Sequence, residues 1–266
     1  MKLQLVSKDK TNTKCSFIID GAEYWYVNSL RRIMINEVPV LAIEDVEFRK
    51  NDSALYDEIV ALRLGLLPLT TDLKTLNLKE ECTCKGAGCS LCQVVFKLKE
   101  KGPKMVYAKS LKANDAKTKV VYPDMPIVKL AKNQELEFVA TAILGKGEEH
   151  VKWSPCLAYY KYYPSIKIDN KKCSKDCKKC IESCPFGILE MKQGKVVVNQ
   201  KKLLECHLCN ACVDACPNDA IQIQEDETKH VFYLESWGQL SCKDIIEEAI
   251  RIFDNKLLQL SKQLKK

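Results

Sequence analysis

The sequence lacks several features that would place the protein in a familiar class. No stretch approaches the roughly 18 consecutive apolar residues of a membrane span, so no transmembrane segment is expected. The opening residues, MKLQ, have the pattern of neither a signal peptide nor a transit peptide, and we therefore expect a cytoplasmic location. The chain also contains no GxGxxG sequence and no P-loop, the glycine-rich motifs that a nucleotide-dependent catalytic or redox module would bring.

Cysteine is nearly absent from the first 81 residues, where only Cys15 occurs, although the chain has 15 cysteines. Most of the others stand in closely spaced clusters between residues 82 and 216. This distribution indicates metal ligation in a reducing compartment rather than a secreted disulfide framework. The isolated Cys15, Cys156 and Cys242 are expected to be small buried hydrophobic residues without a chemical role.

The composition allows a folded protein of one large domain or several small ones. The chain has 266 residues, of which 46% are hydrophobic, enough for a substantial core. Its net charge of +7 comes from scattered lysines, and no basic stripe interleaved with aromatic residues is visible. The charge therefore favours ordinary solvated faces over direct contact with nucleic acid.

Hydrophobic periodicity predicts a mixture of helices and strands. Helices are expected over residues 24–37 and 54–67 and from Ser241 toward the C-terminus. Strands are expected over residues 15–20, 39–48, 94–98, 105–108, 126–130, 136–144 and 230–235. Ser241, with Asp244 three residues later, resembles a capping box for the last helix. That helix has one apolar stripe, which its own domain or a partner must bury: Ile245, Ala249, Ile252, Phe253, Leu257 and Leu260.

Eight cysteines form the two halves of a short internal repeat. The first half has the spacing C-x3-C-x2-C-x3-C-P and the second C-x2-C-x2-C-x3-C-P, which is the bacterial ferredoxin signature. In such a repeat, three thiolates of one triplet bind one cubane cluster, and the cysteine before proline reaches the other cluster. We therefore predict two [4Fe-4S] clusters with crossed ligands. The first set is Cys173, Cys177, Cys180 and Cys216, and the second is Cys206, Cys209, Cys212 and Cys184.

The first half departs from the signature by one extra residue between Cys173 and Cys177. A [3Fe-4S] cluster or an oxygen-labile cluster is therefore an alternative at the first position. Zinc sites are the alternative for all eight cysteines. Zinc ribbons, however, do not require three closely spaced cysteines followed by a fourth before proline. His207, beside Cys206, is expected to be a surface residue rather than a ligand.

A second candidate metal site lies between residues 82 and 92. Four thiols occur within eleven residues, and Gly86 and Gly88 allow the chain to fold back on an ion. Such a closed set suits one structural zinc ion, with the ligands Cys82, Cys84, Cys89 and Cys92. An iron cluster, a metal-free group of thiols and a disulfide pair remain the alternatives.

Two longer segments carry a family resemblance. Residues 24–45, YWYVNSLRRIMINEVPVLAIED, resemble the signature of the alpha-like subunits of cellular RNA polymerases. Residues 53–69, SALYDEIVALRLGLLPL, resemble the next signature of that family, and the two occur in the family's order. The cysteine loop and the ferredoxin-like block are similar to those of the archaeal branch of the family, in the version that has a two-cluster ferredoxin-like domain. The resemblance thus covers nearly the whole chain.

The resemblance implies an α+β fold with three domains. Residues 1–45 and 225–266 would form a discontinuous dimerisation domain. Residues 46–165 would form an inserted, mostly β domain with the zinc loop, and residues 166–224 an inserted ferredoxin-like domain.

The resemblance also implies a non-catalytic assembly scaffold within a nucleotidyltransferase complex. Such a subunit pairs with the small subunit L and recruits subunits N and P and the second-largest subunit, and it meets DNA only through the complex. No catalytic residue and no membrane contact are expected. The alternative function is that of a ferredoxin-type electron-transfer protein or oxidoreductase component. A further hypothesis is that the clusters tune polymerase assembly to redox state.

Overall fold

The chain folds into two compact units, seen in a computed structural model that describes residues 1–173 and 177–265. The first unit comprises Met1–Lys8, Ser16–Asn28 and Tyr159–Tyr233, and the second comprises Asp9–Cys15, Ser29–Ala158 and Leu234–Lys266. Helices and antiparallel strands occur together, which confirms the α+β class. The three-domain division stays a prediction. Among the described helices, none combines the length and the apolar character that a membrane crossing needs.

A four-stranded sheet, most of which belongs to the first unit, has the order β1-β2-β12-β9. Its strands are β1 (Lys2–Lys8), β2 (Lys14–Asp20), β12 (Ile221–Ser236) and β9 (Cys156–Ile168). The strands expected at 15–20 and 230–235 are present, although β12 already begins at Ile221. Every residue of β1 is exposed, so this strand has no buried face that a sequence pattern would reveal.

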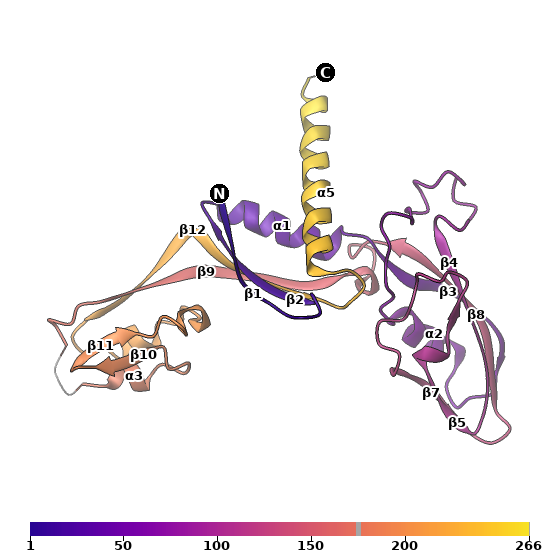
Figure 1. Cartoon of the computed structure of the whole chain (residues 1–266), viewed down its shortest axis with the longest axis horizontal. Helices are drawn as coiled ribbons and strands as arrows, with labels where there is room; N and C mark the ends of the chain where they lie inside the picture. The colour runs from indigo at the N-terminus through magenta and orange to yellow at the C-terminus, as the bar shows by residue number, and fades with distance from the viewer. Residues whose placement is uncertain (174–176, 266) are drawn as a thin grey trace. The chain divides into compact units, whose positions relative to one another are not determined.

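The cysteine-rich part of the first unit is built from very short elements. They are α3 (Lys179–Glu182), β10 (Leu189–Lys192), β11 (Lys195–Val198), the 3-10 helix η3 (Leu203–Glu205) and α4 (Ala211–Asp214). β10 and β11 pair antiparallel around a tight turn in which Gln193 and Gly194 have positive φ. These elements lie at the ends of β9 and β12 (Figure 1).

A small core joins this part to the two long strands. Its buried members are Cys180, Leu189, Val196, Cys212 and Ile221. Ile166 and Ile168, near the end of β9, and Ile223 of β12 pack against it. The same strands therefore belong both to the four-stranded sheet and to the core around the cysteines.

The second unit contains the larger core. One sheet has the order β3-β8-β4-β6 and a smaller one pairs β5 with β7. The strands are β3 (Val40–Asn51), β8 (Glu135–Gly145), β4 (Gln93–Lys101), β6 (Lys112–Ala113), β5 (Lys104–Tyr107) and β7 (Pro126–Leu130). β8 alternates regularly between buried and partly exposed residues, which explains why its pattern predicts a strand. Phe96 of β4 and Phe138 of β8 are fully buried in this core.

The three longer helices are α1 (Tyr24–Asn36), α2 (Asp57–Gly65) and α5 (Cys242–Gln263), and two further 3-10 helices are η1 (Ala108–Ser110) and η2 (Val151–Trp153). All three helices lie within the predicted regions. α2 is shorter than the expected 54–67, because Asn51 and Ser53 hold the preceding segment in a turn. The Asn51 amide donates to the Leu55 carbonyl at 2.9 Å, and the Ser53 hydroxyl donates to Asn51 at 2.6 Å.

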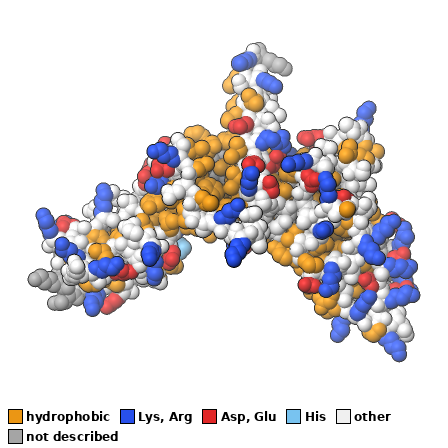
Figure 2. All heavy atoms as spheres, in the orientation of Figure 1, with side chains coloured by type: hydrophobic (Ala, Val, Ile, Leu, Met, Phe, Trp, Pro, Cys, Tyr) orange, Lys and Arg blue, Asp and Glu red, His pale blue; other side chains and the backbone are white. Residues whose placement is uncertain are grey.

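Helix α5 is capped as expected but only half covered. The Ser241 hydroxyl accepts a hydrogen bond from the Asp244 amide at 3.2 Å. Ile245 and Ala249, in the first turns, are fully buried. Farther along the same stripe, Leu257 is 51% exposed and Leu260 is 52% exposed, and orange side chains are visible along this helix in Figure 2.

Candidate metal centres

The cysteines predicted for the first cluster line one small cavity of the first unit. Cys173, Cys177, Cys180 and Cys216 surround it, together with Val196 and Pro217. The three-residue spacer between Cys173 and Cys177 lies outside the described residues. The fourth thiol thus comes from the opposite half of the repeat, as crossed ligation requires.

The cysteines predicted for the second cluster line another small cavity in the same unit. These are Cys184, Cys206, Cys209 and Cys212, and the remaining walls are mainly apolar, with Ile166, Phe186, Leu189 and Ile223. Cys209 is exposed, whereas Cys206 and Cys212 are buried. His207 is exposed, lines this cavity and packs its ring against Phe186 at 4.4 Å between centroids.

The two halves place their cysteines in the same way. Cys180 is the second residue of the four-residue helix α3, and Cys212 is the second residue of the four-residue helix α4. The fourth cysteine of each half accepts a hydrogen bond from an amide four residues later. The Ile188 amide donates to Cys184 Sγ at 3.5 Å, and the Ala220 amide donates to Cys216 Sγ at 3.2 Å. The internal repeat in the sequence is therefore also a repeat in backbone geometry.

One thiol in each group resists ionisation when the thiols are considered alone. Burial raises the pKa of Cys180, and the neighbouring Cys216, Cys173 and Cys177 raise it further. Burial raises the pKa of Cys212 to about 11, with additional repulsion from Cys184 and Cys206. Thiolates gathered in this way need a strongly cationic centre between them.

An iron-sulfur cluster fits this donor set. Each cavity offers four sulfur ligands, and among the described residues that line it there is no competing carboxylate and the remaining walls are largely apolar. Such clusters are held by four cysteine thiolates and supply one-electron redox chemistry.

The predicted zinc loop, residues 82–92 in the second unit, brings its four thiols into one compact group; it is called the zinc loop below. Cys82 Sγ lies 3.6 Å from Cys89 Sγ, and Cys84 Sγ lies 3.6 Å from Cys92 Sγ. All four sulfurs are within 4.8 Å of one another. Sulfurs bound tetrahedrally at ~2.3 Å from a zinc ion would lie ~3.8 Å apart, so the loop has the dimensions of a closed zinc site.

The backbone of the zinc loop is shaped by its glycines. Gly86 and Gly88 have φ of +83° and +89°, the left-handed region that other residues rarely adopt. A side chain at Gly88 would also require the end of the Gln93 side chain to move. Burial opposes ionisation of Cys84, but a hydrogen bond from the Gly88 amide and the neighbouring thiols lower its pKa to about 6. Cys84 therefore ionises more readily than an ordinary cysteine, and a thiolate is the form that binds a metal.

Two residues outside the cysteine motifs hold a ligand loop in place. The Lys161 ammonium of β9 donates to the Leu204 carbonyl at 2.5 Å and to the Cys206 carbonyl at 2.9 Å. The Tyr233 hydroxyl of β12 donates to the same Leu204 carbonyl at 3.3 Å. No local sequence signal marks these contacts, because they join residues that lie far apart in the chain.

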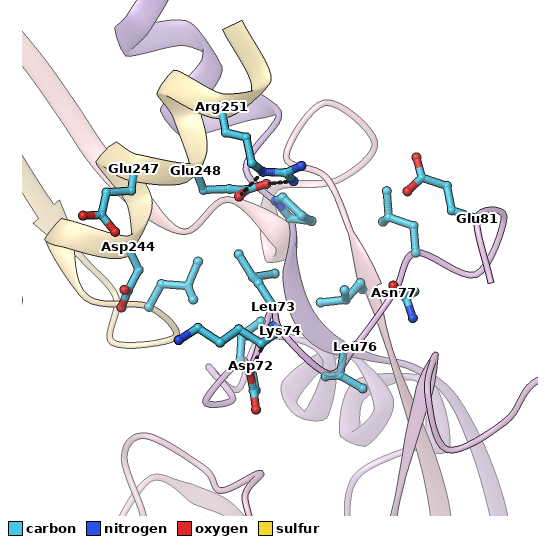
Figure 3. Close-up of a pocket in the computed structure, with 15 residues that line it drawn as sticks. Asp72, Leu73, Lys74, Leu76, Asn77, Glu81, Asp244, Glu247, Glu248 and Arg251 are labelled. Carbon is cyan, nitrogen blue, oxygen red and sulfur yellow. Dashed lines mark hydrogen bonds and ion pairs between the residues drawn. The ribbon is translucent and has the colours of Figure 1, made fainter. Parts of the chain in front are cut away.

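The second unit has a wide groove of about 820 Å³ between the segment that follows Thr71 and the first turns of α5 (Figure 3). Its charged side chains are largely engaged with one another or with neighbours. Arg251 binds Glu248 through two hydrogen bonds, and Lys117 lies 3.3 Å from Asp72. The groove therefore offers paired surface charges rather than a set of carboxylates poised for acid–base chemistry.

Comparison with known proteins agrees with this geometry. Residues 42–156 match the family model described as the RNA polymerase Rpb3/RpoA insert domain, and residues 172–221 match the 4Fe-4S dicluster domain. The second match spans all eight cysteines that line the two cavities.

Full-length relatives are similar from end to end. The chain is 41% identical over 263 residues to DNA-directed RNA polymerase subunit Rpo3 of Methanothermobacter thermautotrophicus, with 97% of each chain covered. It is 38% identical over 257 residues to subunit Rpo3 of Methanosphaera stadtmanae, with 94% of each covered. It is 35% identical to subunit Rpo3 of Methanosarcina acetivorans, with 96% of each covered. The chain belongs to the Rpo3 family of archaeal DNA-directed RNA polymerase subunits.

Proposed function

We propose that this chain is a non-catalytic assembly scaffold of an archaeal DNA-directed RNA polymerase. It pairs with the small subunit L and then recruits subunits N and P and the second-largest subunit. Membership of the Rpo3 family over nearly the whole length supports the role in transcription. The scaffold role is supported above all by the uncovered apolar stripe of α5.

The stripe of α5 has the character of a helix that lacks its partner. Leu257 and Leu260 of α5, and Leu264 directly after its end, follow one another at three- and four-residue spacing and are 51%, 52% and 79% exposed. Covering three such leucines stabilises a complex by several kcal/mol, at about 1.5–3 kcal/mol for each fully buried side chain. We therefore assign this stripe to the interface with subunit L.

Co-expression with subunit L, followed by size-exclusion chromatography, tests the pairing. The wild-type chain is expected to elute as a heterodimer. Leu257→Asp combined with Leu260→Asp is expected to abolish the heterodimer, because two charges would have to be buried in the interface. Asn255→Asp combined with Gln259→Asp adds the same charge to the opposite face of α5 and is expected to preserve it. A wild-type chain that stays monomeric in the presence of L would refute the proposal.

We further propose that the two cysteine-lined cavities hold two [4Fe-4S] clusters and that the zinc loop holds one structural zinc ion. Crossed cluster ligation would tie the two halves of the repeat together, which a segment with so small a core needs for stability. Anaerobic iron, sulfide and zinc analysis with electron paramagnetic resonance tests this assignment. Zinc in the two cavities, or fewer than two clusters in the anaerobic protein, would contradict it.

A regulatory role for the clusters is supported by the strands that border them. β9 and β12 contribute Ile166, Ile168, Ile221 and Ile223 to the core around the cysteines. The same strands are neighbours in the four-stranded sheet. Loss of a cluster would therefore loosen strands of the scaffold, and assembly would respond to redox state.

A further inference from the structure

Lys161 is a partly buried cation whose ammonium group contacts backbone carbonyls rather than a carboxylate. It lies in the middle of β9, and among the described residues it forms no ion pair with a carboxylate. Its contacts are instead two backbone carbonyls, those of Leu204 and Cys206, and the ring of Tyr233 at 5.6 Å. Removing an ammonium group from water is costly unless a negative charge compensates for it.

The position of these carbonyls indicates where a negative charge that compensates the Lys161 ammonium would lie. Leu204 belongs to the 3-10 helix η3, and Cys206 follows directly after that helix. The thiol of Cys206 lines the second cavity, while the carbonyl of the same residue accepts the bond from Lys161. The ammonium therefore lies beside a proposed cluster ligand.

We propose that Lys161 is a positioning residue for the second cluster: it fastens the backbone of Cys206 to strand β9 and supplies positive charge beside the cluster thiolates. The inference rests on the proposed ligand set of Cys184, Cys206, Cys209 and Cys212. Positive charge near a cluster favours the reduced, more negative state and raises the reduction potential. The bond between Cys206 and β9 also links cluster occupancy directly to a strand of the sheet.

The first cavity offers a built-in comparison. Among the described residues, no lysine is found in hydrogen-bond contact with the backbone of Cys173, Cys180 or Cys216, and the Cys216 carbonyl accepts a bond from the Asp219 amide at 3.4 Å instead. Removing the charge of Lys161 should therefore affect the second cluster and leave the first nearly unchanged. This selectivity separates a local electrostatic role from general destabilisation.

The experiment is an anaerobic, dithionite-driven redox titration of the full chain, followed by electron paramagnetic resonance. Cys177→Ser, which removes a ligand of the first set only, assigns the signals. Lys161→Met is expected to lower the reduction equilibrium constant of the second cluster about tenfold, or ~59 mV for one electron. Lys167→Met removes the same charge from an exposed position on the same strand and should leave both potentials unchanged.

Two further variants separate charge from hydrogen bonding. Lys161→Gln retains a donor for the carbonyls without the charge, so it should fold normally and still lower the potential of the second cluster. Lys161→Arg retains the charge and should keep the potential near that of the wild type. With an iron chelator, Lys161→Met should lose the second cluster about tenfold faster than Lys167→Met, as expected when a group that orients a ligand is removed.

The outcomes distinguish a failure of the role proposed for Lys161 from a failure of the cluster assignment. If the wild-type chain binds both clusters but Lys161→Met and Lys161→Gln match Lys167→Met in potential and in cluster loss, the role of Lys161 is refuted and the cluster assignment stands. If the Cys177→Ser chain shows no second cluster by iron and sulfide content, the ligand set and the role of Lys161 both fall.

Discussion

At the scale of single residues, the zinc loop offers the most direct test of a metal site. Cys84 is only partly buried, so replacing its sulfur removes a ligand with little effect on packing. We expect Cys84→Ser to lose the proposed zinc ion and to lower the free energy of unfolding by more than about 3 kcal/mol, because a structural zinc ion contributes folding energy. Zinc analysis and chemical denaturation with and without a chelator measure both effects.

A cysteine outside the loop provides the control for this prediction. Cys156 is buried and far from the zinc loop in sequence, and its thiol donates to the Met34 carbonyl at 3.6 Å. Cys156→Ala should keep the full zinc content and respond to the chelator like the wild type. A Cys84→Ser chain that retained zinc would contradict the proposed ligand set.

His230 makes stability depend on pH. Its ring is fully buried between Tyr160 and Tyr162, and among the described residues neither ring nitrogen has a hydrogen-bond partner. Burial lowers the pKa of His230 below its usual 6.5, although Asp226 and Glu23 oppose the effect. As the pH falls below 6.5 the unfolded chain therefore binds a proton first, and stability present above that pH is lost.

The size of this effect can be measured by chemical denaturation at pH 7 and pH 5.5. The wild type should lose about 1 kcal/mol more than His230→Phe over this interval. His150→Phe, at an exposed position, should behave like the wild type. Equal pH dependence in the wild type and His230→Phe would show that another group is responsible.

The chemistry-bearing residues differ in how far the sequence predicts them. The cysteine spacing predicts the twelve clustered thiols, because each set of ligands is largely local or repeats a known pattern. Lys161 and Tyr233 leave no such trace, because they reach Leu204 from strands β9 and β12, far along the chain. A lysine in a strand usually indicates a solvated face. Only the three-dimensional structure shows that Lys161 contacts the loop that carries Cys206.

At the scale of elements, the N-terminal cap of α5 can be tested by one substitution. The Ser241 hydroxyl accepts the Asp244 amide, which otherwise lacks a partner in the first turn. Ser241→Ala should lower the free energy of unfolding by about 1 kcal/mol. Ser261→Ala, in the exposed part of the same helix, should change it by less than about 0.5 kcal/mol. Equal effects of the two substitutions in denaturation experiments would argue against the cap.

Elements with one buried face are the ones that the sequence predicts. β8 alternates between buried and partly exposed residues, and the expected strand at 136–144 lies within its observed bounds. β10 and β11 have only four residues each, too few for a periodic pattern to emerge. They are held by the core that includes Cys180 and Cys212, so tertiary structure rather than local preference determines them.

At the scale of the whole molecule, the question is whether the clusters affect more than their own segment. The core around the cysteines includes residues of β9 and β12, and Lys161 binds the backbone of Cys206 from β9. A chain that cannot form clusters should therefore have a less ordered sheet. In the proposed pairing with subunit L, such a chain must first order these strands, and that cost weakens binding.

The corresponding prediction concerns Cys180→Ser combined with Cys212→Ser, which removes one buried ligand from each proposed set. We expect this chain to bind subunit L about tenfold more weakly than the wild type, or ~1.4 kcal/mol. Isothermal titration calorimetry under anaerobic conditions measures the two affinities for subunit L. Cys156→Ala, which removes a cysteine outside both sets, is the control. Wild-type protein exposed to oxygen until its clusters are lost should show the same decrease in affinity for subunit L. If cluster-free chains bind L and assemble polymerase as well as the wild type at every oxygen level, the clusters brace only the cysteine-rich segment, and the redox hypothesis fails.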